Sequence, residues 1–188
     1  MLILNDRTPA CGHDPALIVR QLSDLVASLK CGSILLDFQR PDSNENAAVA
    51  KAVTDALPCP VGVSDLYAKG LGCPVFLPPV PLHVPPSEYL SVWQGREIWL
   101  EAALTNETIA VTEQGAVFDS GFPAPQSGHS LTDKKLYCHY ITEPEETQIR
   151  FQLFRTPEDL RALLEFAENQ GVTQAIGLYQ ELTDFSRN

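Results

Sequence analysis

The stretch Gly32–Pro41 constrains the fold of this chain more than any other segment. It starts with a glycine, continues as the apolar run Ile34-Leu35-Leu36, and becomes polar at Asp37 before a proline ends it. An apolar run without alternation is typical of a parallel strand that is buried on both faces. In α/β folds the functional side chains collect at the carboxyl ends of such strands. The segment therefore predicts an α/β fold with a site near Asp37.

The first half of the chain alternates between predicted strands and predicted helices. Asp14 and Pro15 have the residue types of an N-cap and a first helical position, and a second helix is expected from Asn44 to Leu57. The inward faces predicted for the two helices are Ile18, Leu22, Leu25, Val26 and Leu29, and Ala48, Ala52, Val53, Ala56 and Leu57. Strands are expected over residues 2–4, 33–39, 61–65 and 73–77. This order predicts right-handed βαβ units and a parallel sheet.

The pattern changes after the proline-dense segment Pro78–Pro86. A short helix is expected from Ser87, which would cap it, and a longer helix is expected after Thr156. Strands are expected over residues 97–104, 108–111, 116–118, 136–142, 148–154 and 174–182. Two of these runs alternate between apolar and polar residues, so one face of their sheet is exposed to solvent. This half is therefore predicted to contain a largely antiparallel segment.

The elements together predict one α/β domain over residues 1–188, with the antiparallel β segment within residues 97–155. A complete eight-stranded α/β barrel needs about 200 residues or more. With 188 residues the chain is short of that length. We therefore expect an incomplete or small TIM-barrel-like sheet of mainly parallel strands, or an open, doubly wound sheet.

The composition excludes several classes of partner and site. The formal net charge of −11 disfavours nucleic acid and anionic membrane surfaces, because both would be repelled. The five cysteines are widely spaced and the four histidines lack a metal-ligand spacing, so we expect free thiols, no metal and no cofactor. The N-terminal segment is not typical of a signal peptide, and no run of apolar residues is long enough for a membrane span. We expect a soluble, cytoplasmic protein.

Asp37 and Gln39 are the first candidates for a site. They are two residues apart in the predicted strand 33–39, so both side chains are expected on the same face. At the mouth of a barrel that face is the central cavity. The alternative is that Asp37 caps the following loop, with Arg40 as its ion-pair partner.

The segment Leu36-Asp37-Phe38-Gln39 resembles the fourth-strand signature of glycoside hydrolase family 18, the chitinase-like α/β barrels. The motif of that family ends in Asp-x-Glu, where the glutamate is the general acid and the aspartate before it orients the acetamido group of the substrate. In this chain Asp37 matches the aspartate, and Gln39 stands in place of the acid. The earlier acidic positions of the motif are Gly32 and Leu35 here.

The resemblance also implies substrate contacts from two later segments. Ser64, Asp65 and Tyr67 follow the next parallel strand, and Tyr179 lies near the position of the aromatic platform of the family. The resemblance therefore implies a chitinase-like barrel with a glycan as ligand, in which Asp65, Tyr67 and Tyr179 bind substrate.

The glutamine changes the expected chemistry. An amide cannot protonate a glycosidic oxygen near neutral pH. We therefore expect a carbohydrate-binding protein with little or no glycosidase activity, an inactive or impaired relative of the glycoside hydrolases. Two alternatives stay open. Glu101 or Glu181 can supply the acid of an active hydrolase, or the chain is a non-catalytic interaction protein that forms a homodimer through exposed sheet edges.

Overall fold

The computed structural model describes residues 1–7, 14–120 and 129–177, and these divide into two compact units. The first unit comprises Met1–Pro78 and Gly95–Leu100. The second comprises Pro79–Gln94 and the residues from Glu101 on. None of the helices in the described residues is long and apolar enough to cross a membrane. That the two units form one domain stays a prediction.

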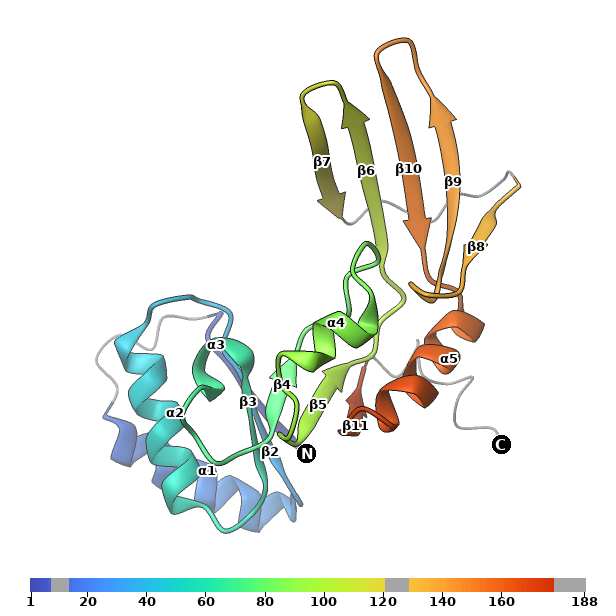
Figure 1. Cartoon of the computed structure of the whole chain (residues 1–188). Coiled ribbons are helices and arrows are strands. Elements are labelled where there is room, and N and C mark those ends of the chain that lie inside the picture. Colours follow the sequence, from blue (N-terminus) through green and yellow to red (C-terminus); the bar gives the residue numbers. More distant parts are fainter. Residues whose placement is uncertain (8–13, 121–128, 178–188) are drawn as a thin grey trace. The chain divides into compact units, whose positions relative to one another are not determined.

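The first unit is built on a parallel sheet in which the strands follow one another in sequence order, β1-β2-β3-β4-β5 (Figure 1). The strands are β1 (Leu2–Asn5), β2 (Ile34–Asp37), β3 (Val61–Ser64), β4 (Val75–Leu77) and β5 (Ile98–Glu101). The helices are α1 (Pro15–Leu29), α2 (Asn44–Ala56) and α3 (Asp65–Ala68). The predicted alternation of strands and helices from β1 to β3 is confirmed, and the short helix α3 was not predicted.

The core of this unit consists of the apolar runs that the sequence indicated as strands. Ile34, Leu36, Val63 and Val75 are completely buried, and Leu35 is nearly so. Each buried side chain of this size contributes about 1.5–3 kcal/mol relative to its exposed state. Because every β2 residue before Asp37 is buried, the first polar side chain of the strand lies at its carboxyl end.

Gly62 allows an aromatic side chain to pack closely against the sheet. A Cβ atom at this position would lie 2.2 Å from Cε3 of Trp99, a residue of β5 that is completely buried. The indole ring therefore occupies the space that any side chain larger than hydrogen would fill at Gly62. The packing across β3, β4 and β5 depends on this glycine.

The predicted inward faces of the two long helices are only partly correct. In α1, Leu22 is buried, but Leu25 and Leu29 are 43% and 60% exposed. In α2 the buried residues are Asn46, Val49, Ala50 and Val53, whereas Ala48 and Ala56 are exposed. Val53 is buried as predicted, but the prediction left out Val49 and Ala50 and counted Ala48 and Ala56, because alanine is a strong helix former on exposed faces as well. The buried stripe also includes the polar Asn46.

The second unit contains an antiparallel sheet with the order β7-β6-β10-β9-β8. Its strands are β6 (Asn106–Thr112), β7 (Gly115–Ser120), β8 (Leu131–Asp133), β9 (Cys138–Pro144) and β10 (Gln148–Phe154). The predicted hairpin between β6 and β7 is confirmed, and β10 has the predicted limits. Strand β8 was not predicted, because it is only three residues long and two of them are exposed.

One face of this sheet packs on a small apolar core. Cys138 and Leu153 are buried with Leu82, and Ile109, Tyr140 and Phe151 pack around them. The pairings Phe151↔Ile109 and Leu153↔Tyr140 place these side chains on the same face of the sheet. The apolar residues of the alternating strands therefore face this core, as predicted.

The remaining elements of the second unit are α4 (Pro86–Ser91), α5 (Pro157–Glu168) and β11 (Val172–Ile176). The N-cap of α4 is Pro85 and not Ser87 as predicted, because two consecutive prolines fix a helical φ at the start of the helix. For α5 the predicted start is confirmed, and Thr156 and Asp159 form a capping box.

In the second unit, the Ile176 carbonyl of β11 accepts a hydrogen bond of 2.7 Å from the amide of Ala102. In the first unit, the strand order β1-β2-β3-β4-β5 runs without the reversal that defines a doubly wound sheet. The predicted class is confirmed: a mixed α/β fold with a parallel sheet of an incomplete TIM-like barrel and a separate antiparallel sheet.

Candidate functional site

The carboxyl ends of β1, β2 and β3 carry polar residues at the same edge of the sheet. Asn5 of β1 is in register with Asp37 of β2. Ser64, the last residue of β3, is buried and donates a hydrogen bond of 2.9 Å from its hydroxyl to the carbonyl of Phe38. The segment after β2 is therefore held against the end of β3, at the edge where α/β folds place their sites.

Asp6 also holds the segment that follows β2. Its carboxylate accepts hydrogen bonds from the amides of Gln39 (3.0 Å) and Arg40 (2.9 Å) and from the side-chain amide of Asn46 (2.7 Å). Burial alone would raise the pKa of Asp6, but these hydrogen bonds outweigh it and lower the pKa below the ordinary value of 3.8. Asp6 therefore stays ionised and joins β1, the segment after β2 and helix α2.

Asp37 and Gln39 are brought together. The side-chain amide of Gln39 donates a hydrogen bond to the carboxylate of Asp37. Asp37 is half-buried at the end of β2, and Gln39 is exposed beyond the strand, which ends two residues earlier than predicted. The described residues include no ion pair between Asp37 and Arg40, so the alternative partner for Asp37 is not present. The contact supplies an anion and a neutral donor, but no group that releases a proton near neutral pH.

Tyr67 lies beside this pair, but its hydroxyl is used by the backbone. It donates a hydrogen bond to the Arg40 carbonyl and accepts one of 3.0 Å from the amide of Ser43. Its ring meets the ring of Phe38 edge to face at 6.0 Å between centroids. Tyr67 therefore orders the turn between β2 and α2, and a contact with substrate stays a prediction.

Asp65 is the first residue of α3 and not the end of a strand, as was expected. It is half-buried, and its carboxylate accepts a hydrogen bond of 3.0 Å from the amide of Leu66. Burial raises the pKa of Asp65 above 3.8 despite this hydrogen bond. Its role in binding substrate also stays a prediction.

Glu101, Tyr179 and Glu181 are the other three candidates. Glu101 is the last residue of β5, is half-buried and belongs to the second unit. Tyr179 and Glu181 lie outside the described residues. The roles predicted for Glu101 and Glu181 as acids and for Tyr179 as a substrate contact stay predictions.

Sequence reasoning missed Asp6 and Asn46. The signal for Asp6 was the one used for Asp37, an acidic residue directly after an apolar strand. Asn46 gave no such signal, because a polar residue near the start of a helix is usually exposed. Among the described residues, no three His, Cys, Asp or Glu side chains are grouped so that they would hold a metal ion.

No protein-family model matches the chain, and no curated protein matches it. Solved structures do resemble it. The spore cortex-lytic enzyme SleL of Bacillus megaterium QM B1551 superposes with a TM-score of 0.56 and 12% sequence identity, over 93% of this chain and 54% of the other. A protein described as a sporulation-specific glycosylase, ydhD of Bacillus subtilis, gives 0.56 and 11%, over 93% and 78% of the two chains.

The C-terminal domain of a protein described as a chitinase, from Desulfitobacterium hafniense DCB-2, superposes with a TM-score of 0.55 and 11% identity. It covers 93% of this chain and 71% of the other. The chain spans about half the length of the spore cortex-lytic enzyme that it resembles. At these identities the comparisons concern the fold alone. The chain therefore has the fold of part of these α/β structures.

Proposed function

We propose that this chain binds carbohydrate through a chitinase-like α/β fold and has little or no glycosidase activity. The likeness in fold to three glycosidase-like structures supports a carbohydrate ligand. The observation that carries the proposal is the hydrogen bond from the Gln39 amide to the Asp37 carboxylate. In the sequence resemblance, Gln39 stands where the motif has its acid.

The chemistry of glycoside hydrolysis supports the second half of the proposal. Most glycosidases use two carboxyl groups, of which one protonates the leaving oxygen. The Gln39 amide donates a hydrogen bond but does not transfer a proton, and its bonded partner Asp37 is an acceptor. This pair can orient a hydroxyl or acetamido group of a sugar without breaking the glycosidic bond.

Binding is tested by saturation-transfer NMR with chitooligosaccharides. We expect transfer to the sugar protons with the wild-type chain and its loss in Asp37→Ala. The matched control is Asp55→Ala, because Asp55 is an exposed aspartate on α2 in a surface ion pair with Lys51. The absence of transfer from the wild-type chain across a panel of neutral oligosaccharides would overturn the proposal of a glycan ligand.

Activity is tested with a fluorogenic aryl glycoside. We expect no turnover by the wild-type chain and a gain of turnover in Gln39→Glu, which restores the acid of the motif. Turnover by the wild-type chain that is lost in Glu101→Gln or Glu181→Gln would instead support the active hydrolase. That result would overturn the proposed inactivity and leave the glycan ligand in place.

A second candidate function is self-association, and β7 is the observation that favours it. This strand is the outer strand of the antiparallel sheet, and Val117 and Phe118 are 65% and 53% exposed. An outer strand with few charged residues is suited to pairing with another strand. We expect Val117→Lys to abolish a homodimer in sedimentation experiments, and a wild-type chain that is monomeric at all concentrations would exclude this function.

A further inference from the structure

A cavity of about 300 Å³ lies in the second unit. It is formed where the start of α4, helix α5 and the loop between β8 and β9 meet. Its main lining residues are Pro85, Pro86, Lys134, Lys135, Tyr137 and Phe166. The volume is at the lower end of the range for small-molecule sites, roughly 300–1,000 Å³. A ligand that fills it is about the size of a single sugar ring.

Two aromatic rings form an apolar wall of this cavity. The ring centroids of Tyr137 and Phe166 are 5.7 Å apart, and the ring planes differ by 34°. Both side chains are half-buried, so part of each ring is accessible. Flat aromatic faces contact the C–H face of a pyranose ring well, and Tyr137 also has a polar end.

Two lysines give the cavity a charge opposite to that of the chain. Lys134 and Lys135 are consecutive and exposed, in a sequence whose formal net charge is −11. Neither ammonium group forms an ion pair with any carboxylate of the described residues. Two unpaired cations beside an apolar wall favour a ligand that carries a negative charge.

The loop over residues 134–137, which carries both lysines, is held in place without a ligand. The carboxylate of Asp133 accepts hydrogen bonds from the amides of Lys135 (2.8 Å) and Leu136 (3.1 Å). Tyr137 has a left-handed φ of 51°, and its carbonyl accepts a hydrogen bond of 3.1 Å from Nε of Arg155.

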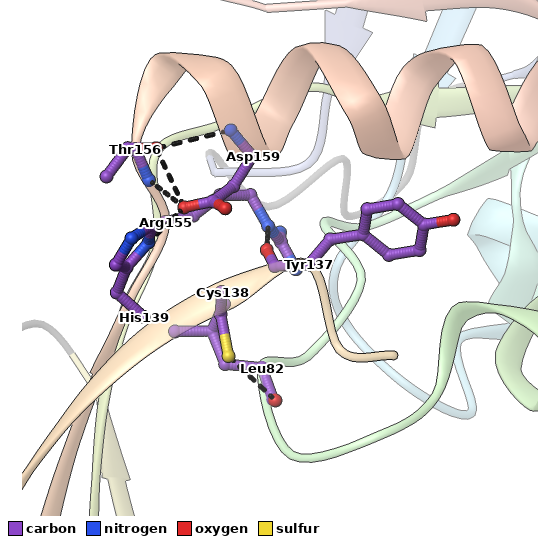
Figure 2. A network of polar contacts seen from close by, with 7 residues as sticks. All are labelled: Leu82, Tyr137, Cys138, His139, Arg155, Thr156 and Asp159. Atoms are coloured by element: carbon purple, nitrogen blue, oxygen red, sulfur yellow. Dashed lines mark hydrogen bonds and ion pairs between the residues drawn. The ribbon is translucent and has the colours of Figure 1, made fainter. Parts of the chain in front are cut away.

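Arg155 is 4% exposed, so this anchor is internal. Figure 2 shows the carbonyl of Tyr137 at the guanidinium group of Arg155 and the ring directed away from the network. Because the loop is ordered by its own contacts, a ligand would not have to order it on binding.

We propose that this cavity binds a small acidic sugar, with the pyranose ring against Tyr137 and Phe166 and the carboxylate beside Lys134 and Lys135. The choice of a sugar ring rests on the proposed function. The requirement for an anion rests on the cavity alone. The lining residues of the cavity belong to the second unit, whereas Asp37 and Gln39 belong to the first.

The test is a titration of the full chain, followed in ¹H–¹⁵N NMR spectra, with glucuronate, glucose and inorganic phosphate. We expect glucuronate to shift the amide signals of residues 134–137 with a Kd of about 1 mM. The Kd values of glucose and phosphate should be higher by about tenfold or more. Equal affinity for glucose would overturn the role of the lysines. Equal affinity for phosphate would overturn the role of the rings, and no shift with glucuronate would overturn the site.

Variants separate this site from the proposed glycan site. The double variant Lys134→Gln/Lys135→Gln is expected to weaken glucuronate binding about tenfold. The matched control Lys51→Gln/Lys69→Gln, which removes two exposed lysines of the first unit, leaves glucuronate binding unchanged. Phe166→Leu keeps an apolar side chain and removes the flat ring, so it is also expected to weaken binding.

Asp37→Ala is expected to leave glucuronate binding intact and to remove only chitooligosaccharide binding. If chitooligosaccharides fail to bind but glucuronate binds, the proposed function fails and the cavity stands. If glucuronate fails to bind but chitooligosaccharides bind, only the cavity proposal fails.

Discussion

Asp6 and Asn46 are joined by a hydrogen bond of 2.7 Å from the side-chain amide of Asn46 to the carboxylate of Asp6. Both residues are buried, and they come from the end of β1 and the first turn of α2. The same carboxylate accepts the amides of Gln39 and Arg40. One buried anion therefore sets the path of the chain directly after Asp37, and the position of the candidate site depends on it.

Replacing Asp6 with Asn is expected to destabilise the first unit. An asparagine puts a donor where three donors already converge, so at least one of them is left without an acceptor. The cost of a buried, unsatisfied donor is about 1–3 kcal/mol, measured as the change in free energy of unfolding in urea at pH 7. The control Asp55→Asn removes an exposed aspartate and is expected to change this free energy by less than about 1 kcal/mol.

The effect of Asp6→Asn is expected to depend on pH. The pKa of Asp6 is lowered in the folded state, so its contribution is fully present above the unfolded value. That contribution is lost as the pH falls from about 4 through the folded-state pKa. The difference in stability between the wild-type chain and Asp6→Asn should therefore shrink on acidification. A difference that stays constant from pH 7 down to about pH 2 would contradict this account.

The sequence predicted what depends on local pattern. The apolar runs of β2, β3 and β4 were correct, since a strand that is buried on both faces is apolar along its whole length. Asp37 and Gln39 were expected on one face of a strand; the strand ends at Asp37, and a hydrogen bond joins the two side chains. These features need no knowledge of where the rest of the chain lies.

Features that depend on distant partners were not predictable. The buried Asn46 is explained only by Asp6, which is forty residues away in sequence. The need for glycine at position 62 is explained only by Trp99, which comes from another strand. Strand β8 is short and largely exposed, so it has no periodicity of its own and exists because β9 pairs with it. In each case the residue type is known from the sequence, but the residue that it contacts depends on the tertiary fold.

Gly62→Ala is expected to destabilise the first unit. The added Cβ atom would lie 2.2 Å and 2.5 Å from two carbons of the Trp99 ring, which is completely buried. Overpacking of this kind costs about 1–3 kcal/mol in free energy of unfolding. The control Gly32→Ala has no atom within 4 Å of the added Cβ, so thermal unfolding of that variant should stay close to wild type. Equal melting temperatures for the two variants would contradict the packing.

Gln39→Glu is expected to make the stability of the chain depend on pH even if no activity is gained. The Gln39 amide donates to Asp37, and a carboxylate in its place would repel Asp37 instead. Two neighbouring carboxylates repel each other once both are ionised, so the variant should be less stable at pH 7 than at pH 4. Urea unfolding at pH 4 and pH 7 measures this loss. Gln39→Ala removes the hydrogen bond without adding a charge, and it should lack the pH dependence.

Thr156→Ala is expected to destabilise helix α5. The hydroxyl of Thr156 accepts a hydrogen bond of 3.2 Å from the amide of Asp159, and the carboxylate of Asp159 accepts one of 2.9 Å from the amide of Thr156. Loss of such an N-cap costs about 0.5–2 kcal/mol. Ser28→Ala on α1 removes a hydroxyl that is exposed and caps no helix start, so it serves as the control in the same unfolding assay.

Cys138 is expected to be the least reactive of the described cysteines. Burial raises the pKa of its thiol to about 12, and the neighbouring guanidinium group of Arg155 opposes this only in part. The thiolate is the reactive form, so at pH 8 almost none of Cys138 can react with iodoacetamide in the folded chain. Cys31, Cys59 and Cys73 are free and half-buried, and they should be alkylated earlier. Mass spectrometry after timed alkylation gives the order in which these cysteines react.

In urea the four thiols should react at similar rates, because the protection comes from the packing of Cys138 with Leu82 and Leu153. Early labelling of Cys138 without denaturant would show that this core opens readily in the native chain.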